Sequence, residues 1–276
     1  MGQTYKDFDL LILDDNSTDG SRKIIEEYVI KHPEIKTCIN EVNSGNPFNQ
    51  WKRGADLSKG EYIWIAESDD YAEPEFLEKT VKVLAEDRNA GLVFTDSKIV
   101  NEQKKIEYLA SDRRKSFSNK RLEKYFNETK GRKKSLRPFL ENPIVNVSSV
   151  LFRRSYFNEA GGVDPSMKFC GDWLLYIKVF LLSGIRYIPE PLNNFRLHAE
   201  SSFQSHYGSN IFLKEKMKIL YFFLKNSRIT VLMIYLVMKE SLKVLILRLL
   251  YFYRLNEKFK IEIPRVPRNA TNLINT

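Results

Sequence analysis

Short apolar runs alternate with segments of helical periodicity along the first two hundred residues. The apolar runs are rich in Ile, Leu, Val and aromatic residues, as strands are, and they span residues 8–15, 35–40, 61–67 and 90–100. The segments of helical periodicity lie between these runs and span residues 22–32, 47–60 and 74–87. This alternation predicts an α/β fold, with a mostly parallel, doubly wound sheet flanked by helices.

The later part of this region is less regular. Residues 101–142 are polar and are expected to form a helical excursion from the sheet. Residues 145–157 read as a strand followed by a helix, and residues 161–184 read as a glycine-rich loop followed by a strongly apolar helix. We expect one domain over residues 1–205 and a separate extension over residues 206–276.

The extension has a different pattern. Between Ile229 and Tyr253 stand 25 residues with only four charges, a length that raises the question of a membrane span. The charges interrupt the stretch, and each would be costly at the centre of a bilayer. A helical projection places most of them on one face, which predicts a basic amphipathic helix. Packing on the body and lying in a membrane interface both remain open.

Charge follows the same division of the chain. The 276 residues carry a net charge of +9, yet residues 1–205 hold 31 basic and 31 acidic side chains. Residues 206–276 hold 13 basic and 4 acidic side chains, so the excess lies in the extension. This predicts contact between residues 206–276 and an anionic membrane surface. Nucleic acid is not expected as a partner, because no recognition motif accompanies the basic residues.

Cysteine usage and the first residues suggest a compartment. Cys38 and Cys170 lie far apart, without the spacing of a disulfide framework or a zinc site. The first residues lack the apolar core of a signal peptide. We expect a cytoplasmic protein, peripheral at the inner face of the membrane.

Two acidic clusters follow apolar runs. Asp14 and Asp15 end one run, and Glu67, Asp69 and Asp70 follow another. Ligands of open α/β sheets bind outside the carboxyl ends of the strands. Like charges repel, so such a cluster costs stability unless a divalent metal, a cationic group of a ligand or water compensates it. Mg²⁺ or Mn²⁺ bound to a diphosphate would do so, although adjacent aspartates also occur in ordinary surface turns.

Four stretches in order carry a resemblance to a known family. They are QTYKDFDLLILDDNSTDGS, KGEYIWIAESDDYAEPEFL, GGVDPSMKFCGDWLLYIKV and FRLH. Over roughly residues 3–200 the chain resembles the family 2 inverting glycosyltransferases of GT-A fold. The resemblance implies metal-dependent transfer of a sugar from a UDP-, dTDP- or GDP-linked donor to a glycan or lipid-linked acceptor. It also suggests a role in polysaccharide biosynthesis at the bacterial cell envelope.

The resemblance implies a nucleotide pocket near the first acidic cluster. Asp15, with Asp14 beside it, matches the carboxylate that contacts the nucleotide base, although a helix cap is the alternative for Asp15. Further residues that would border the pocket are Asn43, Gly45, Lys52 and Arg53. Gly45 permits close backbone approach, whereas Lys52 and Arg53 equally fit an amphipathic helix that covers the sheet.

The same resemblance implies the metal and the base. Asp70 matches the metal ligand, and Asp69 lies close to the ribose or the metal. Asp172 matches the general base that takes the proton of the acceptor hydroxyl, with a helix cap as the alternative and Asp164 as the second candidate. Arg196 and His198 match a motif near the diphosphate and the metal, His198 being a possible ligand.

The chain also departs from the family pattern. The family begins with a strand that ends in a Pro-x-Tyr-Asn-like turn and with a helix that follows it, and neither is present here. Without this central strand, two sheet edges would be unpaired and the nucleotide would be half held. We expect a truncated product of an active lineage. The alternative is an inactive remnant that binds a membrane or a partner, and metal-dependent nucleotide binding separates the two.

Overall fold

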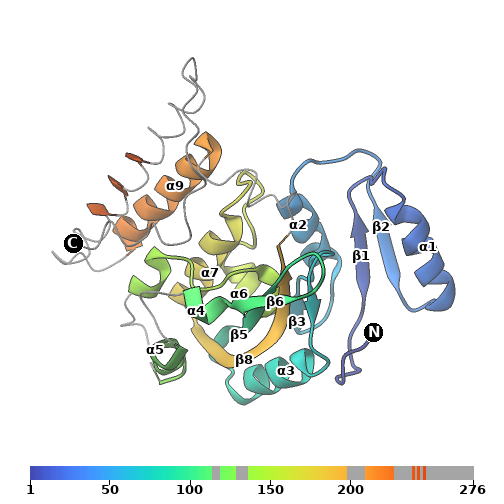
Figure 1. Cartoon of the computed structure of the whole chain (residues 1–276), viewed down its shortest axis with the longest axis horizontal. Coiled ribbons are helices and arrows are strands. Elements are labelled where there is room, and N and C mark those ends of the chain that lie inside the picture. The colour runs from blue at the N-terminus through green and yellow to red at the C-terminus, as the bar shows by residue number, and fades with distance from the viewer. Residues whose placement is uncertain are drawn as a thin grey trace.

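Figure 1 presents the computed structural model of the chain, which describes residues 1–113, 119–128, 136–197 and 209–226 and the pairs 238–239, 241–242 and 245–246. The strands are β1 (Leu11–Asp14), β2 (Lys36–Ile39), β3 (Tyr62–Trp64), β4 (Tyr71–Ala72), β5 (Ala90–Val100), β6 (Ile106–Leu109), β7 (Val150–Arg153) and β8 (Gly184–Arg196). The helices are α1 (Ser21–Lys31), α2 (Pro47–Leu57), α3 (Phe76–Glu86), α4 (Ala110–Arg113), α5 (Asn119–Glu123), α6 (Arg154–Glu159), α7 (Gly171–Leu182) and α9 (Asn210–Asn226), with short helical turns η1 (Lys124–Glu128), η2 (Arg137–Leu140) and η3 (Val147–Ser149).

The strands form two sheets. The smaller pairs β1 with β2, and the larger runs in the order β3-β7-β5-β8-β4, with β6 on β5. The α/β class is confirmed, but the expectation of mostly parallel strands is wrong. Only the pairs β1·β2 and β5·β8 are parallel among the described strands, and the other four pairs are antiparallel. A parallel neighbour needs a crossover connection, whereas β6 follows β5 through a short turn and so returns antiparallel.

β1 and β3 each have one edge with no neighbouring strand among the described residues. β1 pairs with β2 alone, and β3 pairs with β7 alone. The backbone N–H groups of Lys36 and Asn40 donate to the carbonyl oxygens of Leu10 and Asp14 at 3.0 and 2.8 Å. Alternate residues of a strand point their peptide groups to opposite sides, so Leu11 and Leu13 present theirs on the far edge. Among the described strands, β2, β4 and β6 also pair on one side only, so the missing central strand stays a prediction from the sequence.

The core lies on both faces of the larger sheet. Leu92 and Phe94 of β5 point into the main cluster with α6, α7 and α9, whereas Val93 between them points to the opposite face with α3. This alternation is the period-two pattern of a strand. It explains why the first half of β5, residues 90–94, reads as an uninterrupted apolar run, since helices cover the sheet on both sides (Figure 1).

Part of the predicted extension joins this core. Five buried side chains of α9 belong to the main cluster, namely Phe212, Leu213, Ile219, Leu220 and Phe223. Residues 210–226 therefore pack on the body. Within the described parts of the chain, no helix has the length and apolar character needed to cross a bilayer. The basic amphipathic helix predicted over residues 229–253 lies almost entirely outside the described residues.

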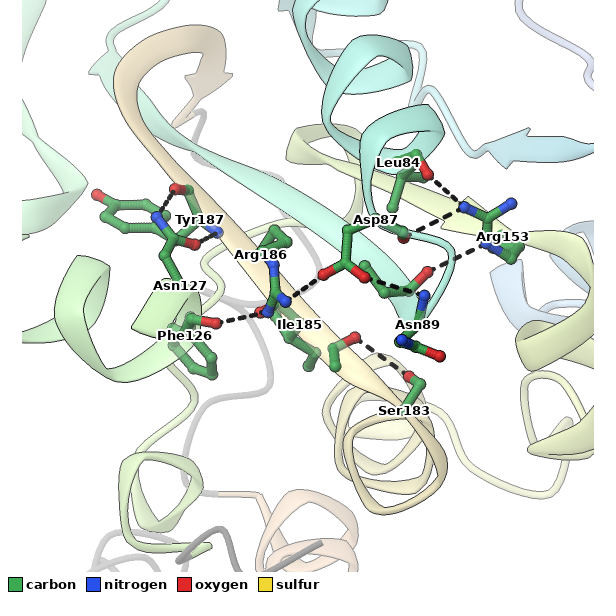
Figure 2. Close-up of polar contacts among 12 residues, drawn as sticks. Leu84, Asp87, Asn89, Phe126, Asn127, Arg153, Ser183, Ile185, Arg186 and Tyr187 are labelled. Atoms are coloured by element: carbon green, nitrogen blue, oxygen red, sulfur yellow. Dashed lines mark hydrogen bonds and ion pairs between the residues drawn. The ribbon is translucent and has the colours of Figure 1, made fainter. Parts of the chain in front are cut away.

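A polar network fastens the ends of the central strands (Figure 2). Arg153 on β7 is 8% exposed and donates from Nε to the carbonyl oxygen of Ala90 at 3.2 Å. Its guanidinium also donates to the carbonyl oxygen of Leu84 and pairs with Glu61 at 2.7 Å. Arg186 on β8 pairs with Asp87, close to the same turn. The turn between α3 and β5 is therefore held by two arginines from the strands on either side of β5.

Arg153→Met is expected to lower the free energy of unfolding by about 2–4 kcal/mol. The two buried carbonyl oxygens of Leu84 and Ala90 lose their donor, and each unpaired group costs about 1–3 kcal/mol. Urea denaturation followed by circular dichroism measures the change. Arg88→Met is the control, because Arg88 is exposed on the same turn. Equal midpoints for the two variants would show that the network adds nothing.

Candidate functional site

Three carboxylates converge in the turn between β3 and β4. One oxygen from each of Glu67, Asp69 and Asp70 lies within 4.8 Å of the others. The turn is fixed at both ends, because β3 and β4 are paired into the sheet. The N–H of Glu67 also donates to Ser148 Oγ at 3.1 Å, and that of Asp70 to the Glu67 carbonyl oxygen at 3.2 Å. The positions of the three carboxylates are therefore fixed by the backbone of this turn.

Donors from two distant segments hold Asp70. Asn146 Nδ2 donates to Asp70 Oδ2 at 2.6 Å, and Asn146 is itself buried and bonded to Asn193. At the end of β8, the N–H of Arg196 donates to Asp70 Oδ1 at 3.1 Å and its Nε to the Asp69 carbonyl oxygen at 2.7 Å. The structure thus brings Arg196 beside Asp69 and Asp70. Residue His198 lies outside the described residues.

The electrostatics of the cluster favour a bound cation. Burial raises the pKa of Glu67 to about 8, and the charges of Asp70, Asp69 and Asp172 add to this. Burial also raises the pKa of Asp70, against the bonds from Asn146 and Ser148. A divalent ion would relieve this repulsion. The donor set consists of oxygens alone, which fits Mg²⁺ or Mn²⁺.

The stability of the metal-free protein is expected to fall as the pH rises from about 4 to 8. Glu67 and Asp172 have pKa values of about 8 and 7 in the fold, above their unfolded values of 4.5 and 3.8. The folded state therefore binds more protons in this window, and the contribution is lost once the pH passes the folded pKa values. Mn²⁺ should raise the melting temperature more at pH 8 than at pH 5. Scanning calorimetry measures the melting temperature with and without Mn²⁺ at each pH. An equal effect of Mn²⁺ at the two pH values would contradict a metal site at these carboxylates.

Asp172 stands in the first turn of α7. It accepts hydrogen bonds from the Trp173 N–H and from the side chain of Asn142, and burial raises its pKa to about 7. Its charge contributes to the raised pKa of Glu67, so Asp172 is in electrostatic reach of the cluster. A glycine directly before a catalytic candidate could make the backbone flexible. Instead, Gly171 is buried, and a Cβ at this position would lie 2.7 Å from the Phe48 ring, so the glycine serves close packing.

The first acidic cluster organises loops. Asp14 is buried and accepts from the Ser17 N–H at 3.1 Å and from Arg22 Nε at 3.3 Å. Asp15 accepts from four donors at 2.6–3.0 Å, namely Asn40 Nδ2, Gln50 Nε2, Ser44 N and Ser44 Oγ. Burial alone would raise the pKa of Asp15, but these donors outweigh it and hold it below its usual value. Asp15 does not cap a helix, because α1 begins after Gly20.

The other predicted pocket residues divide into two groups. Asn43 Oδ1 accepts the Gly45 N–H at 2.7 Å, and Gly45 has a φ of +62°, which favours glycine. Arg53 donates to the side chain of Asn40, a partner of Asp15. Lys52 instead pairs with Asp56 at 2.7 Å on the exposed face of α2. Three of the four residues thus lie around the loop that Asp15 holds, whereas Lys52 forms its ion pair within α2.

Asn46 links this loop to the one before Asp172. Its side chain caps α2 by accepting the Phe48 N–H at 3.0 Å, with Pro47 at the first helical position. Its Nδ2 donates to the carbonyl oxygens of Pro165 and Met167, both at 2.9 Å. Nearby, Asp164 accepts the Ser166 N–H at 2.9 Å, as in a simple turn.

Sequence reasoning missed several polar residues that hold the site. Asn142, Asn146 and Ser148 contact Asp172, Asp70 and Glu67 from one segment. The available signal was the regular interruption of an apolar run by polar residues in NPIVNVSSV, residues 142–150. The partners lie far away in sequence, up to 81 residues for Ser148 and Glu67, so periodicity could not reveal them.

Comparison with known proteins gives structural and sequence relatives. An uncharacterised protein of Mycobacterium tuberculosis is 27% identical over 205 residues, covering 72% of this chain and 53% of the relative. S. aureus TarS 1–349 in complex with UDP-GlcNAc matches with a TM-score of 0.64 at 17% identity, covering 94% of this chain and 70% of that one. The Pyrobaculum calidifontis mannosyltransferase PcManGT in complex with GDP-Man and Mn²⁺ matches with a TM-score of 0.59 at 14% identity, with the same coverage.

These likenesses confirm the expected GT-A-like fold. The chain spans about half the length of the first curated relatives that it matches. The family model described as glycosyl transferase family 2 matches residues 1–161. With this match over more than half of its length, the chain belongs to glycosyl transferase family 2.

Proposed function

We propose that this protein is a metal-dependent, inverting glycosyltransferase that uses a nucleotide-diphosphate sugar as donor. The observation that carries the proposal is the cluster of Glu67, Asp69 and Asp70, braced by Asn146 and Arg196. The bound molecules of the two structural neighbours, UDP-GlcNAc in one and GDP-Man with Mn²⁺ in the other, support this donor class. UDP-, dTDP- and GDP-linked sugars are the candidates.

Asp70 would hold the metal, with Glu67 and Asp69 beside it and His198 as a further proposed ligand. A bound Mg²⁺ or Mn²⁺ would stabilise the negative charge of the departing diphosphate. Arg196 places a guanidinium at the same turn, where a cation attracts the diphosphate. The raised pKa of Glu67 shows that the folded protein holds these carboxylates close together against their repulsion, as a functional site would.

Asp172 would act as the general base. Its carboxylate takes the proton of the acceptor hydroxyl while that oxygen forms a bond to the anomeric carbon. The bond from this carbon to the diphosphate oxygen breaks on the opposite face, and the diphosphate leaves with the electron pair, which inverts the configuration. A pKa of about 7 suits this task, because a base works best when its pKa lies near the operating pH.

Asp15 is proposed to contact the nucleotide base, with Asp14, Asn43, Gly45 and Arg53 around it. Asp15→Asn is expected to weaken UDP binding about tenfold or more, because a hydrogen bond to a charged acceptor contributes about 1.5–3 kcal/mol. Isothermal titration calorimetry measures the dissociation constant. Lys52→Gln is the control, since Lys52 is exposed and pairs with Asp56 within α2. Unchanged binding by Asp15→Asn would limit Asp15 to bracing the loop.

A glycan or lipid-linked acceptor and a membrane-surface contact through residues 206–276 complete the proposal. This would place the protein in bacterial envelope polysaccharide synthesis at the inner face of the membrane. The exposed residues of α9 support the contact, since Ile211, Met217 and Tyr221 alternate with Lys214 and Lys218. Sedimentation with vesicles tests it: binding to anionic vesicles but not to neutral ones is expected, and binding to neither would contradict it.

A donor screen tests the enzymatic proposal. Purified protein is incubated with UDP-, dTDP- and GDP-linked sugars, with and without Mn²⁺, and the released nucleotide diphosphate is measured. We expect metal-dependent release of the nucleotide diphosphate from one donor class. The sugar would be transferred either to water or to an added glycan. Nucleotide binding without release from any donor would favour the second candidate, an inactive remnant. The observation that supports this second candidate is that, among the described strands, β1 and β3 each pair with a strand on one side only.

A further inference from the structure

A buried carboxylate from α9 contacts the loop that precedes Asp172. Glu215 is 4% exposed. Its Oε1 accepts the N–H of Lys168 at 2.7 Å, and its Oε2 accepts the N–H groups of Phe169 and Cys170, both at 2.9 Å. Three consecutive peptide groups are thus bound by one side chain, 45–47 residues away in sequence.

This contact occupies the place of a helix cap. α7 begins at Gly171, and Cys170 at its N-cap position makes no side-chain capping bond. The N-terminus of a helix leaves N–H groups unpaired and favours a negative charge nearby. Glu215 supplies that charge from a different helix, immediately before the turn that carries Asp172.

Both sides of the contact are anchored. On α9, Leu213 and Ile219 are buried in the main core on either side of Glu215. On the loop, Met167 accepts from Asn46, and Gly171 packs against Phe48. Glu215 therefore joins two rigid parts of the molecule. It also lies outside residues 1–161, where the family model matches.

We propose that Glu215 is a positioning residue, which fixes the main chain of residues 168–170 and thereby directs the Asp172 carboxylate toward the acceptor. This inference rests on the proposed function of Asp172. It gives α9 a part in catalysis, since the helix supplies a support for the active-site loop in addition to its packing on the body. Glu215 does not touch the substrate.

Glu215→Gln tests the proposal, because it keeps the size of the side chain but removes its charge. An amide nitrogen replaces one carboxylate oxygen and cannot accept the N–H groups. The turnover number should fall about 10- to 100-fold, since small displacements of a catalytic group cost this much. The KM for the donor should stay within about twofold, because the metal and nucleotide residues lie on other elements.

The pH profile gives a readout that simple loss of packing would not change. The groups that act electrostatically on Asp172 or feel its charge are Glu67, Cys170, Tyr176 and Glu215. Among them, Glu215 contributes a negative charge that keeps a proton on Asp172. Removal of this charge should therefore move the acid limb of the rate profile to lower pH. Glu215→Asp keeps the charge, so it should retain the position of the limb even if its shorter reach lowers the rate.

Amide hydrogen exchange of the whole chain separates this inference from the proposed function. Glu215→Gln should speed exchange at residues 168–170, and Lys214→Gln, an exposed neighbour on α9, should not. If Glu215→Gln keeps the wild-type turnover number, the wild-type position of the acid limb and the wild-type exchange rates, the inference about Glu215 is overturned. The proposed function would still stand in that case. If the wild-type chain transfers no sugar, the proposed function and the catalytic role of Glu215 both fall, and exchange still decides whether Glu215 holds the loop.

Discussion

Asp172→Asn is expected to lower the turnover number by about 10²–10⁴-fold, the usual contribution of a positioned base. The amide has the same shape as the carboxyl group, but it cannot take the proton of the acceptor hydroxyl. Donor binding should be nearly unchanged, since the acidic cluster lies in a separate turn. Single-turnover measurement of sugar transfer and calorimetry with the donor's nucleotide separate the two effects.

The pH dependence of sugar transfer by the wild-type protein should also arise from Asp172. As the proposed base, Asp172 would act in its deprotonated form, and burial raises its pKa to about 7. Below that pKa, the rate should fall about tenfold for each pH unit. A bound divalent ion beside Glu67 would move this limb to lower pH. The limb should be absent from any residual activity of Asp172→Asn.

Asp164→Asn is the matched control, because Asp164 was the second candidate for the base. Its carboxylate accepts the Ser166 N–H within its own turn. This variant should keep the wild-type turnover number within about threefold, a difference near 0.6 kcal/mol. Full activity in Asp172→Asn, or loss of activity in Asp164→Asn alone, would transfer the role of base to Asp164.

Asp70→Asn is expected to abolish the response to Mn²⁺ and to lower transfer by about 10³-fold, which corresponds to about 4 kcal/mol. The amide is a poorer ligand for a hard cation, and it removes a negative charge that attracts the ion. Activity as a function of Mn²⁺ concentration measures the loss. Asp56→Asn on the exposed face of α2 is the control and should behave as the wild type.

The same variant should gain stability when no metal is present. Asp70 raises the pKa of Glu67 by repulsion, and its own pKa is raised by burial. Removal of this charge relieves both effects at pH 8. A higher melting temperature together with lost metal response would identify a site whose charges serve function at the expense of stability. A lower melting temperature together with a lost metal response would indicate that Asp70 mainly supports the fold.

The sequence predicted the elements better than their pairing. The run at residues 90–100 coincides with β5, and the segment at residues 22–32 is displaced by one residue from α1. Both have clear periodicity and turn residues at their ends. The direction of β7 was not predictable, because a strand with only three apolar residues in a row looks the same in either orientation.

The candidate site divides in the same way. Asp15, Asp70 and Asp172 were singled out because they match motifs of the family that the sequence resembles, and the positions of Asp15 and Asp70 after apolar runs added to that match. Their supports, Asn146 and Glu215, were not. A polar residue that bonds across more than 40 residues of sequence leaves no periodic signal, and Glu215 sits in a helix whose other charged residues are lysines.

Calorimetric titration of UDP, dTDP and GDP into the wild-type chain and into Asp70→Asn, each with and without Mn²⁺, tests the central claim most directly. The claim is that the turn between β3 and β4 holds a metal that binds a nucleotide diphosphate. Binding of at least one nucleotide that requires both Mn²⁺ and Asp70 is the predicted result. Binding that is equally strong without the metal, or in Asp70→Asn, would contradict it, as would the absence of binding to all three nucleotides.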